Sequence, residues 1–215
     1  MERSAIVLAG GSSTRIGEDK GLLKLAGKPL LNHIINAVKE HVEEIVVVTS
    51  SEERVKRYSA LAGKNIRFAR DKVDLKGPLI GAMTGFSVAQ GKYSLLLPFD
   101  TPFVSGEIVT MLFEACVGKT AAIPRWPNGQ IEPLYAVYGT TVARDAALSA
   151  IGEGRLDMRG MIEKMHGVRY VSTLVMQQLD PELKTFFNIN TRADLKKAAR
   201  LMTERKQMRG SLFGS

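Results

Sequence analysis

The chain of 215 residues is 45% hydrophobic and carries a formal net charge of +8 at pH 7, which gives enough apolar material for one sizeable core. No run of about 18 uncharged apolar residues occurs, and glycines appear before a signal-peptide core could form, so we expect a cytoplasmic protein without a membrane span. Its lone cysteine, Cys116, excludes an internal disulfide, and its three scattered histidines lack zinc-ligand spacing.

The excess positive charge is concentrated near the C-terminus. Between Arg192 and Arg209, seven basic residues stand against two acidic ones. A solvated helix face accounts for this pattern, and attraction of an anionic substrate or partner is the alternative. The segment has no interleaved aromatic side chains for stacking on bases, so we expect no nucleic-acid partner.

In chain order, short apolar runs alternate with segments of helical periodicity. The runs AIVLA and SLLLP are apolar on both faces, which is typical of parallel strands covered by helices on both sides. The first half of the chain therefore predicts strands at 4–9, 44–50, 66–70 and 93–98, separated by helices at 29–41, near 53–62 and at 78–90.

The second half begins with Ser105, a candidate N-cap for the helix that follows it. AAIPRW then leads through the turn signal PNG at 127–129 to a strand at 133–138, as a hairpin or an antiparallel edge. Thr191, followed by Asp194, nearly matches a capping box, so the final helix should start just after NINT. Between them we expect helices at 140–151 and 156–165 and a strand at 168–173.

These elements predict an α/β fold, a single Rossmann-like three-layer α/β/α domain. Its sheet should be mostly parallel with a small antiparallel excursion. The domain should span residues 1–203, followed by a basic, flexible tail at 204–215. In such a sheet a ligand binds beyond the carboxyl ends of the strands, so the segments that follow each strand hold the candidate site.

The loop after the first strand is rich in glycine and hydroxyl side chains. Gly10, Gly11 and Gly17 bracket SST, and glycine lets several backbone N–H groups point into one concavity that favours an anion. Arg15 and Lys20 would neutralise a charge too large for N–H groups alone. A triphosphate fits this combination better than a neutral ligand.

Two familiar phosphate loops are excluded. A dinucleotide fingerprint needs G-x-G-x-x-G opening directly into a helix, whereas this loop has adjacent glycines and a long segment before the next helix. GKT at 118–120 resembles the end of a P-loop, but Phe113 stands where its first glycine belongs.

PFDTPF places one carboxylate, Asp100, immediately beyond a buried strand and between two prolines. Because Mg²⁺ takes only one or two protein carboxylates and leaves its other positions to phosphates and water, Asp100 suffices for a metal site. The structural alternative is that Asp100 caps the next turn.

Asp71 follows the third strand, ahead of the Gly77-Pro78 turn. Its carboxylate could accept hydrogen bonds from ribose hydroxyls or help to organise the metal. By itself this stretch also fits an ordinary loop.

These motifs together resemble nucleotidyltransferases of the GT-A-like, sugar-nucleotide type, and most closely the molybdenum cofactor guanylyltransferase (MobA) family. The resemblance rests on four segments in the family's order, spanning nearly all of residues 4–200: LAGGSSTRIGEDKGLLKLAGKPLL, GPLIG, LPFDTPF and FFNINT.

The resemblance implies that GTP binds through Leu8, Ala9 and Gly10, with Lys20 on its phosphates. It implies that Asp71 binds the nucleotide and that Asp100 holds both GTP and Mg²⁺. It also associates Asn188 and Asn190 with the pterin side of the cleft. Two positions depart from the family pattern: Thr49 or Ser50 stands where relatives often carry Asn, and Glu132 where they carry Gln or His.

The implied reaction joins molybdopterin to GMP, with pyrophosphate as the leaving group. Both reactants are anions, so catalysis should come from positioning and charge neutralisation, with Arg15 and Lys20 facing the leaving group. An already ionised acceptor phosphate needs no general base. Transient contact with molybdoenzymes or cofactor-insertion proteins is also implied.

Alternative functions remain open at this point. One is another transferase of this architecture, acting with CTP on molybdopterin or on a sugar phosphate or cobinamide phosphate. Relatives that use CTP tend to read LAAG, so Gly10 favours guanine through resemblance. A non-catalytic carrier of nucleotide or pterin is the alternative from another class, and it would lack the metal carboxylate or the phosphate lysine. Both Asp100 and Lys20 are present.

Overall fold

A computed structural model describes residues 1–10, 19–60, 66–71 and 77–212, with side chains through Glu204. Within these ranges the chain forms a seven-stranded sheet in the order β5-β4-β1-β6-β8-β7-β9. All strands run parallel except β8, which pairs antiparallel with both β6 and β7. The strands are β1 Arg3–Leu8, β4 Glu44–Thr49, β5 Ile66–Arg70, β6 Tyr93–Pro98, β7 Ala121–Arg125, β8 Ala136–Gly139 and β9 Val168–Ser172.

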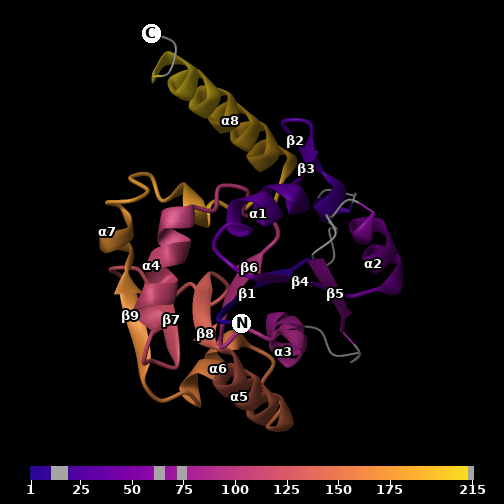
Figure 1. The fold of residues 1–215 in the computed structure, drawn as a ribbon, viewed down its shortest axis with the longest axis vertical. Coiled ribbons are helices and arrows are strands. Elements are labelled where there is room, and N and C mark those ends of the chain that lie inside the picture. Colours follow the sequence, from indigo (N-terminus) through magenta and orange to yellow (C-terminus); the bar gives the residue numbers. More distant parts are fainter. Residues whose placement is uncertain (11–18, 61–65, 72–76, 213–215) are drawn as a thin grey trace.

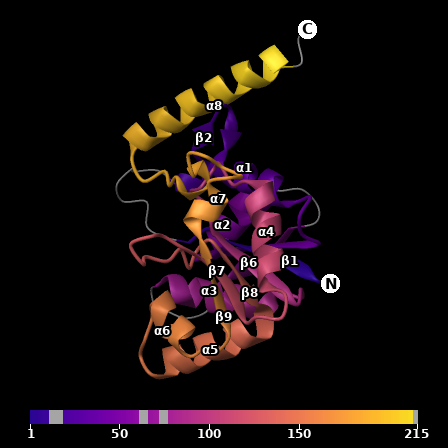
Figure 2. The ribbon, with the colours of Figure 1, turned by 90° about the vertical axis from the view of Figure 1, so that its left-hand side faces the viewer.

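Helices cover both faces of this sheet, as Figures 1 and 2 show. Alternate side chains of β1 point to opposite faces: Ala5 and Val7 pack with α1 and α4, whereas Ile6 and Leu8 pack with α3. Because Ala5, Ile6, Val7 and Leu8 are buried under helices on one face or the other, this part of β1 has to be continuously apolar. The helices are α1 Leu30–Val38, α2 Glu52–Ser59, α3 Pro78–Val88, α4 Gly106–Cys116, α5 Thr140–Gly152, α6 Met158–Glu163, α7 Thr173–Met176 and α8 Arg192–Leu212.

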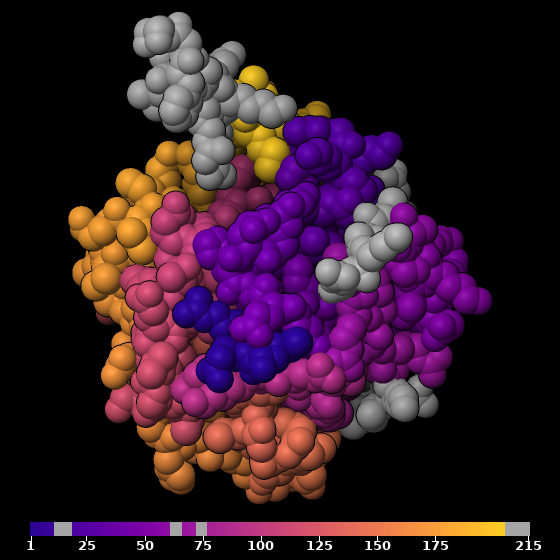
Figure 3. Space-filling view, viewed as in Figure 1, coloured from indigo at the N-terminus to yellow at the C-terminus, as the bar shows by residue number. Residues whose placement is uncertain are grey.

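A small hairpin lies apart from the main sheet, between β2 Lys24–Leu25 and β3 Lys28–Pro29. Its turn residues Ala26 and Gly27 both have positive φ, 49° and 81°, as a two-residue type I′ turn requires. The hairpin and the start of α8 share a small apolar cluster that includes Leu25, Phe103, Ile189 and Ala198. In the space-filling view, α8 stands beside this hairpin at one end of the molecule (Figure 3).

The predicted α/β/α architecture is confirmed, and strands 66–70 and 93–98 match β5 and β6 to the residue. Ser105 caps α4, since its Oγ accepts from Ile108 N. Thr191 and Asp194 form a reciprocal box at the start of α8: Asp194 N donates to Thr191 Oγ1 (3.1 Å) and Thr191 N to Asp194 Oδ2 (2.8 Å).

Three expectations differ from the structure. The predicted strand at 133–138 begins only at Ala136, because residues 133–135 form a turn closed by Tyr135 N donating to Glu132 O. Of the two alternatives for this strand, the hairpin is confirmed, because β7 and β8 are consecutive and pair antiparallel. The edge is wrong, because β8 lies between β6 and β7 and the edge strand is β9. The β2–β3 hairpin and α7 were not predicted, because two-residue strands and a four-residue helix are too short to show periodicity.

The predicted domain boundary at 203/204 falls inside α8, which continues as helix to Leu212, and the flexibility of the tail stays a prediction. Cys116 is buried, as expected. Within the described residues, no helix combines the length and the apolar character needed to cross a bilayer.

Candidate active site

The carboxyl ends of β1, β4, β6 and β7 lie at one edge of the sheet, because these strands are parallel. The PFDTPF segment after β6 and the FNINT segment before α8 meet at this edge, where Ile189 N donates to Asp100 O at 2.9 Å. Thr101 Oγ1 donates back to Pro98 O at 3.0 Å and fixes the turn that carries Asp100. Two segments about 90 positions apart thus form one backbone-bonded platform.

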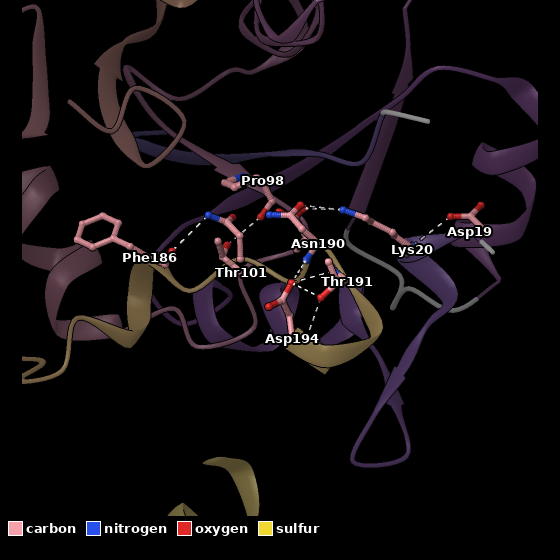
Figure 4. A network of polar contacts seen from close by, with 11 residues as sticks. Asp19, Lys20, Pro98, Thr101, Phe186, Asn190, Thr191 and Asp194 are labelled. Carbon is pink, nitrogen blue, oxygen red and sulfur yellow. Dashed lines mark hydrogen bonds and ion pairs between the residues drawn. The ribbon is translucent and has the colours of Figure 1, made fainter. Parts of the chain in front are cut away.

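Lys20 extends over this platform from the first loop (Figure 4). Its Nζ lies 3.4 Å from Asp100 Oδ2 and 3.1 Å from Asn190 Oδ1. The side chains of Lys20 and Asp100 are each only 15% exposed. Three of the residues predicted from separate motifs therefore come together in one polar cluster, in which Lys20 and Asp100 are largely buried and Asn190 is exposed.

The charge balance at Asp100 depends on two opposing effects. Burial raises the pKa of the Asp100 carboxyl, while the Lys20 ammonium acts in the lowering direction through its charge and hydrogen bond. The 3.4 Å separation is longer than the 2.7–2.9 Å of a strong charge-assisted hydrogen bond. Lys20 therefore neutralises the negative charge of the Asp100 carboxylate only in part, and the carboxylate is suited to bind a further cation.

A divalent ion fits this donor set in one particular way. Among the described residues, no group of three or more His, Cys, Asp or Glu side chains could enclose a metal. Asp100 offers one carboxylate, and the Lys20 ammonium beside it is a cation that can bind phosphate. An ion held there would draw its remaining ligands from substrate phosphates and water, which is the usual arrangement for Mg²⁺.

Asp71 lies further along the same edge, after β5, where its N–H donates to Thr49 O at 3.0 Å. In the sheet order β5 is three strands from β6, a separation of about 14 Å at normal strand spacing. This spacing separates the strand backbones, and the Asp71 carboxylate itself lies near Gly81, which also faces Leu8 of β1. Both alternatives for Asp71, nucleotide binding and organising the metal, therefore stay predictions.

The Asp71 carboxyl has an unusual environment. Its Oδ1 is buried and has no hydrogen-bond partner among the described residues, and its Oδ2 faces Gly81 at the start of α3. Burial raises the pKa of this carboxyl, against a lowering contribution from the Thr84 hydroxyl. A buried acceptor without a donor is costly unless a ligand supplies one.

The nucleoside side of the edge is formed by the ends of β1 and β4. Gly10 lies close to Ser50, since a methyl group at Gly10 would be 3.9 Å from Ser50 N. Thr49 is fully buried and its hydroxyl donates to Ser51 O, whereas Ser50 is exposed. Of the two residues at the variant position, Ser50 is thus the one that faces the edge. Gly11 and Arg15 lie outside the described residues.

The Asn pair is split between two environments. Asn190 contacts Lys20, and its backbone N–H donates to Asp194 Oδ2, so the box that starts α8 also fixes Asn190. Asn188 is exposed and its amide donates to Phe186 O at 3.3 Å. Nearby, Glu132 accepts a 2.7 Å hydrogen bond from the Trp126 indole, whose ring packs against Phe186.

Sequence reasoning missed one group beside this cluster. Arg54 and Tyr58 both contact Asp19, the residue before Lys20. The available signal was the i, i+4 spacing of Arg54 and Tyr58, which places both side chains on one face of α2. Trp126, directly after β7, was also not predicted at this edge.

Comparisons with known proteins agree on one family. The family model described as the MobA-like NTP transferase domain matches residues 5–168. A Methanosarcina mazei protein named "probable molybdenum cofactor guanylyltransferase" is 36% identical, over 90% of this chain and 88% of its own. A Natronomonas pharaonis protein of the same name is 30% identical, over 92% and 96%. The crystal structure of molybdopterin-guanine dinucleotide biosynthesis protein A from Archaeoglobus fulgidus superposes with a TM-score of 0.80, at 27% identity over 94% and 99% of the two chains.

Proposed function

Because the chain belongs to the MobA-like NTP transferase family, we propose that it transfers GMP from GTP to the phosphate of molybdopterin. The acceptor phosphate oxygen attacks the α-phosphorus of GTP, a new phosphoanhydride bond forms, and pyrophosphate leaves. One observation carries the proposal at this chain's own site: Lys20 of the first loop lies between Asp100 and Asn190, at 3.4 and 3.1 Å. These three groups are what a transfer between two phosphates needs, namely a fixed cation, a metal carboxylate and an orienting amide.

Nucleotidyltransferases of this kind use a divalent metal ion, and for this chain we propose Mg²⁺ on Asp100. The ion supplies Lewis-acid neutralisation of phosphate oxygens when it is bound. This assignment is supported by the Asp100 carboxylate, whose negative charge is neutralised only in part by Lys20 at 3.4 Å. Lys20 then has the triphosphate as its partner, and Arg15 is proposed to act beside it.

The nucleoside is proposed to lie across the ends of β1 and β4. The backbone of Leu8, Ala9 and Gly10 approaches it, with Ser50 at the neighbouring strand end. Asp71 offers Oδ1, which no donor among the described residues reaches, to a donor group of the base or ribose. Because a missing donor would leave this buried oxygen without a hydrogen bond, Asp71 favours a ligand that can supply one. Gly11, the next residue of this loop, is proposed to contact the nucleotide as well.

The acceptor is proposed to enter from the side of Asn188 and Asn190. Asn190 is oriented by Asp194 and contacts Lys20. It can therefore hold the acceptor close to Lys20 and Asp100. No general base is needed, since a phosphate at neutral pH is ionised. The chain's contribution is therefore orientation and charge, which hold two anions within reacting distance. Transient contact with molybdoenzymes, which would receive the product, is part of this proposal.

The test is an assay with purified protein, molybdopterin, Mg²⁺ and each of GTP, CTP, ATP and UTP in turn. Pyrophosphate release and the mass of the pterin product are both measured. We expect release with GTP and a product heavier by one GMP unit, with Asp100→Asn as the inactive control. Preferential use of CTP would establish a cytidylyltransferase instead. Tight binding of GTP or pterin without any pyrophosphate release would establish the carrier alternative.

A further inference from the structure

The residue before Lys20 is the centre of a second polar group. Asp19 caps the short 3₁₀ helix η1, Lys20–Leu22, because its Oδ1 accepts from Gly21 N at 3.1 Å. The same Oδ1 accepts from Tyr58 Oη at 2.5 Å, and Oδ2 lies 3.4 Å from Arg54 Nε. The Asp19 side chain is 13% exposed, so these contacts are shielded from solvent. Asp19 is the link between α2 and the turn that carries Lys20.

Both partners of Asp19 come from α2. This helix starts at Ser51, whose Oγ accepts from Arg54 N, so the position of its first turn is fixed. Tyr58 is fully buried against Gly21, where an added methyl group would lie 2.4 Å from the phenolic oxygen. Burial and the Asp19 carboxylate raise the pKa of the Tyr58 hydroxyl. The hydroxyl therefore remains a donor throughout the accessible pH range.

Arg54 also reaches the nucleoside side of the edge. Its Nη1 donates to Ser50 Oγ at 3.1 Å, and Ser50 is the residue that lies against Gly10. One guanidinium thus contacts both the Lys20 turn and the connection from β4 to α2. A planar guanidinium with several fixed donors suits this dual contact better than an ammonium would.

We propose that Arg54 and Tyr58 are positioning residues for transfer, which hold Lys20 Nζ between Asp100 and Asn190 by fixing Asp19. Neither side chain contacts Lys20 Nζ, Asp100 or Asn190 in any hydrogen bond or ion pair of the described residues. The physical reason is that a lysine has a long, flexible stem, and its charge is effective only if the backbone that carries it is fixed. This inference rests on the proposed function.

The test uses the full-length chain and two hydroxyl deletions. Tyr58→Phe removes the donor to Asp19 and keeps the ring against Gly21. Tyr93→Phe is the matched control: it removes a hydroxyl that accepts from Gly118 N at 3.4 Å, at the amino end of β6 and the opposite edge of the sheet. We expect kcat to fall about tenfold in Tyr58→Phe, short of the ~100-fold that a full ångström of misplacement can cost, and to stay unchanged in Tyr93→Phe.

A double-mutant cycle with Lys20 then separates positioning from general loss of stability. The Kd for GTP with Mg²⁺ is measured for wild type, Tyr58→Phe, Lys20→Ala and the double variant. If Tyr58 acts through Lys20, its deletion weakens binding in the wild type and has no further effect once Lys20 is gone. Equal weakening in both backgrounds would overturn the proposal. Arg54→Gln should behave like Tyr58→Phe. The effect of Arg54→Lys should be intermediate, because lysine keeps the positive charge but lacks the several fixed N–H donors of the guanidinium.

The outcomes also separate this proposal from the proposed function. If Lys20→Ala has normal turnover, the role of Lys20 itself is wrong. If Lys20→Ala is inactive and Tyr58→Phe and Arg54→Gln turn over normally, only the positioning role is wrong. Thermal unfolding of Tyr58→Phe and Tyr93→Phe is recorded alongside, and a loss of kcat that simply follows the fraction unfolded at the assay temperature would also overturn it.

Discussion

Lys20 Nζ lies 3.4 Å from Asp100 Oδ2, although the two residues are 80 positions apart in the chain. The contact joins the loop after β1 to the loop after β6, and these strands are direct neighbours in the sheet. Parallel pairing brings their carboxyl ends together, so a cation from one loop and a carboxylate from the other can share a site. The sheet order is therefore what turns two separate motifs into one cluster.

Replacing Asp100 by Asn tests the metal role with almost no change in shape. We expect GMP transfer to fall by at least about 100-fold, because the variant lacks the negative charge that holds the cation. The melting temperature should stay level or rise slightly, because burial already disfavours the ionised form. Turnover is measured over a range of Mg²⁺ concentrations. Near-normal rates at low Mg²⁺ would contradict the assignment.

Gly21 tests the packing that supports the Lys20 turn. A methyl group there would lie 2.6 Å from Tyr58 Cζ, so Gly21→Ala must displace the buried ring or η1. We expect a loss of about 1–3 kcal/mol in the free energy of unfolding together with weaker GTP binding. Gly152→Ala, at the end of α5 with nothing within 4 Å, is the control and should keep wild-type binding. Denaturant unfolding and GTP titration of both variants check this pair.

The sequence predicted the elements of the main sheet because strand and helix periodicities differ there, and because glycines, prolines and Ser105 mark the boundaries. It also predicted Lys20 and Asp100 as site residues, since each lies in the segment that follows a strand at the carboxyl edge, whereas Asn190 was predicted through the family resemblance. Their meeting in one cluster depends on strand order, which local periodicity does not contain. Arg54 and Tyr58 were missed for a related reason: on α2 they resemble any exposed helical pair until Asp19 is placed beside them.

Glu44 provides a structural carboxylate for comparison with the site. Its side chain is 5% exposed and accepts from Ser4 Oγ, Gln90 N and Arg67 Nη1. Burial by itself would raise the pKa of Glu44, but these hydrogen bonds and the Arg67 charge outweigh it, and the pKa lies below the ordinary 4.5. A lowered pKa contributes stability that is present above pH 4.5 and is lost as the pH falls through the folded-state pKa.

We therefore expect Glu44→Gln to destabilise the protein at pH 7 by about 2 kcal/mol, the scale of hydrogen bonds to a charged group. The difference from wild type should shrink as the pH falls below 4.5. Urea unfolding at several pH values measures it. A destabilisation independent of pH would show that the charge of Glu44 does not contribute.

Asp71 should show the opposite dependence. Burial raises its pKa above the ordinary 3.8, so the stability linked to this group is fully present below pH 3.8 and is lost as the pH rises through the folded-state pKa. Burial disfavours the ionised carboxylate, and no donor among the described residues reaches its Oδ1. Asp71→Asn removes that charge, and we expect the melting temperature to rise at pH 7.5 by about 2–4 °C for ~1 kcal/mol.

This gain should decrease steadily as the pH is lowered toward 3.8, and Asp145→Asn, at a 60% exposed carboxylate beside Arg144, is the control for removing a surface carboxylate. GTP binding should weaken in Asp71→Asn, because the buried acceptor that the nucleotide would satisfy has changed. A variant that is more stable and binds GTP less tightly is the signature of a group retained for a ligand at a cost in stability. Calorimetric titration with GTP and thermal unfolding of the same preparations measure both quantities. Unchanged GTP affinity would remove Asp71 from the nucleotide site, and an unchanged melting temperature at pH 7.5 would show that its unpartnered oxygen is already solvated.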